Sequence, residues 1–83
     1  MELNNKLLLI LENFEYQKVI SSNVDIVGYD PETSILSLEF KDGGVYNYFD
    51  VPINVFRNLK RAASKGKFCH RRIYPFYDYE KVK

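Results

Sequence analysis

Residues 44–52, with the sequence Gly-Val-Tyr-Asn-Tyr-Phe-Asp-Val-Pro, join the two halves of this chain. Their β-branched and aromatic side chains are typical of a strand, and the final proline suits the first turn of a helix, where a missing N–H is tolerated. The residues before this stretch have sheet-like patterns, and the residues after it have helical ones. This order predicts an α+β domain with strands first and helices second.

The composition predicts one compact domain without a disulfide. Of the 83 residues, 46% are hydrophobic and 16% are aromatic, which favours a folded globule over a disordered chain. The single cysteine excludes an internal disulfide and a multi-cysteine metal site. The longest uncharged apolar run, Leu7 to Leu11, is too short for a membrane span, and its flanks do not resemble a signal peptide. We therefore expect a cytoplasmic protein that does not use a membrane.

The charges are separated along the chain. Residues 1–50 hold nine acidic and three basic side chains, whereas residues 51–77 hold seven basic side chains and no acidic one. The net charge of +1 conceals this division. A basic half of this kind indicates a surface for an anionic partner.

Residues 1–18 form an N-terminal extension that fits two structures. Five apolar residues recur at the spacing of one helical face: Leu3, Leu7, Ile10, Leu11 and Phe14. A strand over residues 6–11 is the alternative, and we favour the helix. Leu8 and Leu9 widen its apolar face beyond one contact stripe, so we expect a second copy of the protein to cover it in a homodimer.

Three segments have the composition of strands: residues 24–29, 35–40 and 45–49. In the first, Val24, Ile26 and Gly28 are expected on one face, because side chains alternate along a strand. Turns at residues 30–33 and 41–44 separate the segments. The three strands therefore predict an antiparallel meander.

The register of the second hairpin decides where Tyr46 and Tyr48 lie. A two-residue turn would place both on the face opposite Leu38. A three-residue loop, with Gly43 in the left-handed conformation, would place Tyr46 beside Leu38 and Tyr48 beside Leu36. We favour the second register because it groups the large side chains on one face. The tyrosines are then core residues, although two rings on one strand face could also stack on RNA bases.

Two helices are predicted after the sheet, over residues 52–63 and 65–73. The first has a buried stripe of five residues: Val55, Phe56, Leu59, Ala62 and Ala63. The second begins after Ser64 as N-cap and turns three residues inward: Phe68, Cys69 and Ile73. Residues 75–83 form an aromatic tail that we expect to pack on the domain.

Five short segments resemble the KTSC domain, a family named for its place at the C-terminus of some lysyl-tRNA synthetases. They are Ser21-Ser22-Asn23, Val27-Gly28-Tyr29-Asp30, Tyr46-Asn47-Tyr48, Val51-Pro52 and Ser64-Lys65-Gly66-Lys67-Phe68. They occur in the family's order and cover residues 19–74. This length is similar to that of free-standing bacterial and phage members. The resemblance implies a small domain for which RNA binding has been suggested, and Cys69 stands where an aromatic residue is common.

The basic block is the main candidate site. It contains seven residues: Arg57, Lys60, Arg61, Lys65, Lys67, Arg71 and Arg72. Such side chains neutralise phosphates and give affinity that falls with salt. Ser64 and Gly66 begin the second helix, where free N–H groups would suit one phosphate. Tyr77 lies in a tail that could stack on unpaired bases. The alternative is a solvated surface balanced by the acidic half of the chain.

The sequence shows no catalytic group. Cys69 and His70 are neighbours on a predicted helix and point in different directions, so they form neither a nucleophile pair nor a metal site. We predict a non-enzymatic module without a cofactor that binds RNA or another phosphate-bearing, nucleotide-type ligand. The alternative is a protein-interaction factor, encoded by a phage and acting on a host protein, that uses the basic patch or the N-terminal segment.

Overall fold

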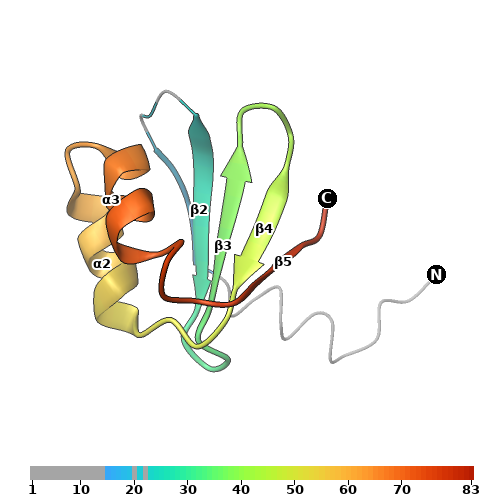
Figure 1. The fold of residues 1–83 in the computed structure, drawn as a ribbon, viewed down its shortest axis with the longest axis vertical. Helices are drawn as coiled ribbons and strands as arrows, with labels where there is room; N and C mark the ends of the chain where they lie inside the picture. Colours follow the sequence, from blue (N-terminus) through green and yellow to red (C-terminus); the bar gives the residue numbers. More distant parts are fainter. Residues whose placement is uncertain (1–14, 20, 22) are drawn as a thin grey trace.

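The computed structural model describes residues 15–19, 21 and 23–83, and there a five-stranded antiparallel sheet packs against two helices (Figure 1). The strands are β1 (Glu15–Lys18), β2 (Val24–Asp30), β3 (Ile35–Phe40), β4 (Val45–Tyr48) and β5 (Tyr79–Lys81), and they lie side by side in chain order. The helices are α2 (Ile53–Arg61) and α3 (Lys65–Arg72), and both cover the same face of the sheet. The predicted α+β class and the central meander are confirmed.

The sequence does not predict the two edge strands. Strand β1 pairs with β2, so the prediction of a helix over residues 1–18 is wrong for residues 15–18. Strand β5 pairs with β4 and places Tyr79 opposite Tyr48. Both segments are short, and they become strands because the edges of the central meander offer unpaired N–H and C=O groups. The remainder of the predicted N-terminal helix lies outside the described residues.

An irregularity in β2 changes the face that each of its side chains occupies. The register shifts between Val24 and Ile26, so that Val24 lies opposite Phe40 and Ile26 lies opposite Glu39. After this bulge, Val27 is fully buried on the core face and Ile26 lies on the other one. The prediction that Val24 and Ile26 share a face is therefore wrong, because the extra residue reverses the alternation.

The second hairpin has the favoured register. Gly43 has a φ of 93° and donates its N–H to the carbonyl of Phe40 over 2.9 Å. Tyr46 lies opposite Leu38, and Tyr48 lies opposite Leu36. The prediction from the left-handed glycine is confirmed: the bulge at Gly43 brings both tyrosines onto the core face.

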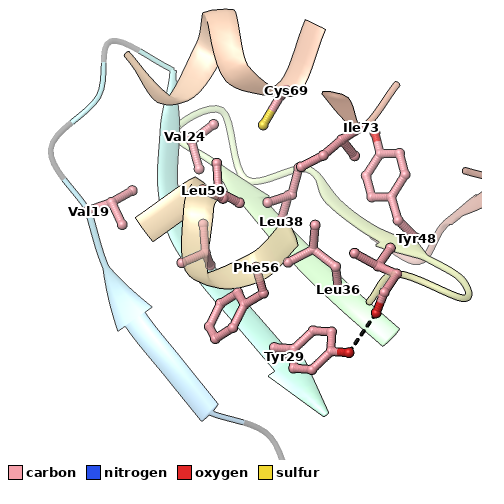
Figure 2. Close-up of a cluster of buried hydrophobic side chains, with 12 residues drawn as sticks. Val19, Val24, Tyr29, Leu36, Leu38, Tyr48, Phe56, Leu59, Cys69 and Ile73 are labelled. Atoms are coloured by element: carbon pink, nitrogen blue, oxygen red, sulfur yellow. Dashed lines mark hydrogen bonds between the residues drawn. The ribbon is translucent and has the colours of Figure 1, made fainter. Parts of the chain in front are cut away.

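The core lies between the sheet and the two helices (Figure 2). Phe56 and Leu59 of α2 and Cys69 of α3 are buried, as predicted, and the ring of Phe56 stacks on that of Tyr29 at 5.0 Å. Helix α2 is shorter than expected. Pro52 is its N-cap, with a ψ of 148°, and stands just outside the first helical turn.

The two alanines predicted to lie on the buried stripe of α2 are not buried. Ala62 is the C-cap residue and is half-buried, and Ala63 is exposed in the linker to α3. The helical period ends at Arg61, so the stripe does not reach them. No helix of the described residues is long and apolar enough to cross a membrane.

Candidate functional site

The seven basic residues of the candidate site lie on α2 and α3. Two of them, Lys60 and Lys65, make contacts with groups of helix α2 and its C-cap. The ammonium of Lys65 donates to the carbonyl oxygens of Lys60 and Ala62 over 3.0 and 2.5 Å, so it caps the C-terminus of the helix. The ammonium of Lys60 lies 4.6 Å from the centre of the Phe56 ring, a cation–π contact.

The N-terminus of α3 is capped from within the chain. The hydroxyl of Ser64 accepts a hydrogen bond from the N–H of Lys67 over 3.2 Å, which confirms the predicted N-cap. A Cβ built on Gly66 would lie 3.4 Å from the side-chain oxygen of Asn23. The turn before β2 therefore lies beside α3 at an ordinary contact distance. Phosphate binding at this helix end stays a prediction.

Three other basic residues line a hollow between α3 and the linker that precedes it. Lys67, Arg71 and Arg72 line a space of about 390 Å³ together with Phe68. Phe68 and Arg72 also line a space of about 340 Å³, so the two spaces are neighbours. We call the lining of both the interhelical groove: Asn54, Val55, Asn58, Ala62, Ala63, Ser64, Lys67, Phe68, Arg71, Arg72, Phe76 and Tyr77.

The charge of the interhelical groove is unbalanced. No carboxylate belongs to its lining in the described part of the chain. One ion pair among the described residues, Lys18 with Asp25 at 3.8 Å, lies elsewhere. Lys67, Arg71 and Arg72 are exposed and therefore present their charges to solvent. Arg57 and Arg61 are exposed on α2 and do not line the groove.

The groove also contains neutral groups that sequence reasoning missed. Asn54 and Asn58 come from successive turns of α2, and Phe76 is 69% exposed at one end. The signal for the amides was their spacing of four residues, which places them on one side of a helix. Tyr77, predicted to stack on bases, lines the same end and is half-buried.

The other two candidate stacking residues lie apart from the groove. Tyr48 is only 4% exposed and stacks on Tyr74 with the ring centres 5.8 Å apart. Tyr46 is half-buried and meets the ring of Phe40 edge-on at 5.6 Å. Tyr48 is therefore a core residue, as the favoured register predicts.

Cys69 is an inert thiol in this fold. It is fully buried, and burial raises its pKa to about 11, although a hydrogen bond with Tyr74 acts in the opposite direction. His70 is exposed and packs edge-on against Tyr74 at 5.0 Å. Among the described residues, no group of three His, Cys, Asp or Glu side chains could hold a metal ion.

The segments that carry the family resemblance form structural contacts. The Tyr29 hydroxyl donates to the Val51 carbonyl over 2.6 Å, the dashed line in Figure 2. The carboxylate of Asp30 is buried and accepts from the Glu32 N–H over 3.0 Å and the Thr33 hydroxyl over 2.8 Å. These residues hold the turn between β2 and β3 and the approach to α2, so they specify the fold.

Comparison with known proteins confirms the family resemblance of these segments. A family model described as the KTSC domain matches residues 20–79. The chain belongs to the KTSC domain family. A KTSC domain protein from Yersinia pestis has a similar crystal structure, with a TM-score of 0.80 and 33% identity over 84% of this chain and 99% of that one.

Related KTSC sequences occur both alone and within a larger enzyme. A protein of Tsukamurella paurometabola is 42% identical over 71% of this chain and 88% of its own length. A lysine–tRNA ligase of Nostoc sp. is 38% identical over 83% of this chain. This chain spans 12% of that ligase, so the similarity concerns a small module of it.

Proposed function

We propose that this KTSC domain is a non-enzymatic module that binds RNA through the interhelical groove. The observation that carries the proposal is the convergence of Lys67, Arg71 and Arg72 on one groove whose described lining has no carboxylate. Three exposed cations without an acidic neighbour favour an anionic ligand. The groove continues past them to aromatic and amide side chains, which suit a base-containing ligand better than a simple anion.

In this mechanism a short single-stranded segment of RNA lies along the groove. The guanidinium groups of Arg71 and Arg72 bind phosphates, because their planar donors match two phosphate oxygens at once. Phe76, which is 69% exposed, offers a ring face to an unpaired base. The Asn54 and Asn58 amides lie at the same end of the groove and can hydrogen-bond to base edges.

Relatives support this choice of ligand. The similar module in Nostoc sp. belongs to a lysine–tRNA ligase, and such an enzyme acts on an RNA. A basic module would raise the local affinity of its host for RNA through sequence-independent phosphate contacts. We infer the same use for the present chain.

The test is a fluorescence anisotropy titration with a labelled single-stranded RNA and with the same RNA as a duplex. With three phosphates neutralised, affinity for the single strand should fall about 20-fold between about 50 and 200 mM salt. A Lys67→Glu/Arg71→Glu variant should lose most of this binding. An Arg57→Glu/Arg61→Glu variant is the matched control, because it has the same net charge and the same number of changed residues, all outside the groove.

Equal losses in the two variants would show that the whole surface attracts RNA and would overturn the role of the groove. An absence of binding at the lower salt would overturn the RNA proposal. The groove would then be assigned to a protein partner, for which the exposed Phe76 ring and the half-buried Phe68 provide apolar contacts.

A further inference from the structure

A second cavity lies apart from the interhelical groove and shares no residue with it. It has a volume of about 420 Å³. Strands β3, β4 and β5 contribute to it, as do the hairpin between β3 and β4 and the segment that leaves α3 and crosses to β5 (Figure 1). We call it the aromatic cleft, and six residues line it: Phe40, Asp42, Tyr46, Tyr48, Tyr74 and Tyr79.

The five rings of the cleft brace one another. Tyr46 contacts Phe40 edge-on at 5.6 Å and Tyr79 at 5.8 Å, measured between ring centres. Tyr48 contacts Tyr79 at 5.5 Å and Tyr74 at 5.8 Å. These rings belong to four different segments, and all five line the cavity. Their mutual contacts also mean that little reordering is needed when a ligand enters.

Asp42 is the one carboxylate in the described lining of the cleft, and no Lys or Arg lines it. Its Oδ1 accepts a hydrogen bond from the N–H of Gly44 over 2.9 Å. This bond holds the carboxylate in the hairpin beside the rings. Tyr48 and Tyr74 add no charge near neutral pH, because burial raises the pKa of Tyr48 to about 12 and that of Tyr74 further still. The lining of the cleft therefore carries one negative charge, that of Asp42, and the ammonium of Lys81 lies beyond this lining, near Tyr46.

The faces of aromatic rings are also negative, and one of them already meets a cation of this chain. The ammonium of Lys81, on strand β5, lies 5.7 Å from the centre of the Tyr46 ring. Aromatic rings that line one space, with a carboxylate beside them, favour cations over neutral molecules where a ring face is accessible. A phosphate would meet repulsion from Asp42, so the cleft does not suit the ligand proposed for the groove.

We propose that the aromatic cleft binds an alkylated ammonium group. An unmodified ammonium carries three N–H donors and is strongly hydrated, so it needs several acceptors when it leaves water. The lining offers mainly carbon surface and one carboxylate, and this suits a cation whose N–H groups are replaced by methyl groups. Such a group occurs in small quaternary amines and in methylated lysine side chains of proteins.

The experiment is a proton NMR titration of the full chain that follows the tyrosine ring signals. The probes are choline and dimethylbutanol, its uncharged isostere, in which carbon replaces the quaternary nitrogen. Choline should bind with a millimolar or tighter Kd, at least about tenfold tighter than the isostere. Equal affinities would mean that the cleft is merely apolar, and absence of choline binding would equally overturn the proposal.

Variants locate the site. Tyr46→Leu should weaken choline binding about tenfold, whereas Tyr46→Phe keeps the ring and should bind as wild type does. Asp42→Asn keeps an acceptor for the Gly44 N–H and should still weaken binding several-fold, because the charge is lost. Lys81→Met should tighten binding, because it removes a competing cation from the Tyr46 ring. If Tyr46→Leu left the affinity unchanged while its spectrum remained that of a folded chain, the assignment to this cleft would be wrong.

A peptide with one trimethyl-lysine distinguishes the two sources of the cation. Binding of this peptide at least tenfold tighter than choline, and tighter than its unmethylated form, assigns the cleft to a protein partner. Equal affinity for the peptide and choline assigns it to a small amine. Because the Lys67→Glu/Arg71→Glu variant changes only the groove, it should bind choline normally, so this proposal and the RNA proposal can fail independently.

Discussion

The hydroxyl of Tyr29 donates a hydrogen bond of 2.6 Å to the carbonyl oxygen of Val51, although 22 positions separate the two residues. Both residues are buried, with Tyr29 at 1% and Val51 at 0% exposure. The bond joins the end of β2 to the residue two positions before α2, while the Tyr29 ring stacks on Phe56 of that helix. One side chain therefore fixes both the start and the orientation of α2 on the sheet.

Removal of the buried Tyr29 hydroxyl should lower the stability of the domain. We expect Tyr29→Phe to lower the free energy of unfolding by about 1 to 2 kcal/mol, because the Val51 carbonyl would remain buried without its partner. Urea denaturation measures the change. Tyr79→Phe is the matched control, because this residue is 60% exposed and its removal leaves no buried partner of the kind that Val51 provides. Similar losses in both variants would contradict the role given to the bond.

Substitution by alanine should have opposite effects on stability at Gly43, in the turn between β3 and β4, and at Gly66, in helix α3. Gly43 has a φ of 93°, so Gly43→Ala should destabilise the domain by about 1 kcal/mol through backbone strain. Gly66 lies in the first turn of α3, where a new Cβ would meet only the tip of the exposed Asn23 side chain at 3.4 Å. Gly66→Ala should therefore be neutral or stabilise by up to about 1 kcal/mol. Thermal unfolding of the two variants compares them directly.

Lys65 and Lys67 should separate stability from RNA affinity. Lys65→Met removes the ammonium that caps the C-terminus of α2, so we expect a loss of about 1 kcal/mol and nearly unchanged RNA binding. Lys67→Met removes an exposed charge of the groove and should weaken RNA binding with little change in unfolding. Circular dichroism and the anisotropy titration provide the two readouts. The reverse pattern would show that Lys65 contacts the ligand.

The buried thiol should resist alkylation. Burial raises the pKa of Cys69 from 9.0 to about 11, so the thiolate fraction at pH 8 falls about 100-fold. Iodoacetamide should therefore modify native Cys69 at least that much more slowly than the same residue in denaturant. Equal rates in the native and denatured chain would show that the thiol is accessible.

Alkaline pH should destabilise the fold through the same group. Between about pH 9 and 11 the unfolded chain loses the Cys69 proton while the folded chain keeps it, so the free energy of unfolding falls as the pH rises. Tyr48 acts in the same direction between pH 10 and about 12, because its pKa is raised too. A Cys69→Ala variant, compared by urea denaturation across this range, should show a shallower decline. An equally steep decline would assign the effect to other groups.

Local sequence predicted the central fold because the relevant signals act over a few residues. The alternation in residues 35–40 predicted a strand with Leu36 and Leu38 on the core face, and both are fully buried. A glycine at position 43 predicted the bulge and hence the register of both tyrosines. Ser64 predicted the start of α3 through its N-cap bond. Each of these depends on the backbone preference of one residue or on a period of two or about four residues.

Contacts between residues distant in the chain determine the edge strands and the irregularity in β2, which the local signals did not predict. The sequence did not indicate that residues 15–18 and 79–81 would extend the sheet, because an edge strand forms in response to a neighbour's unpaired backbone. The shift between Val24 and Ile26 was also invisible, since nothing local marks an extra residue there.

The candidate sites divide in the same way. The amino-acid sequence alone determined that residues 51–77 carry seven positive charges without a negative one, since composition needs no fold. Only the tertiary structure decided that Lys65 caps α2 while Lys67, Arg71 and Arg72 meet in the interhelical groove. It also brought five rings and Asp42 together, although Phe40 and Tyr79 are 39 positions apart, and no periodicity within one element could reveal such a cleft. The physical reason is that charge and backbone preference belong to single residues, whereas a site is set by the packing of segments distant in the chain.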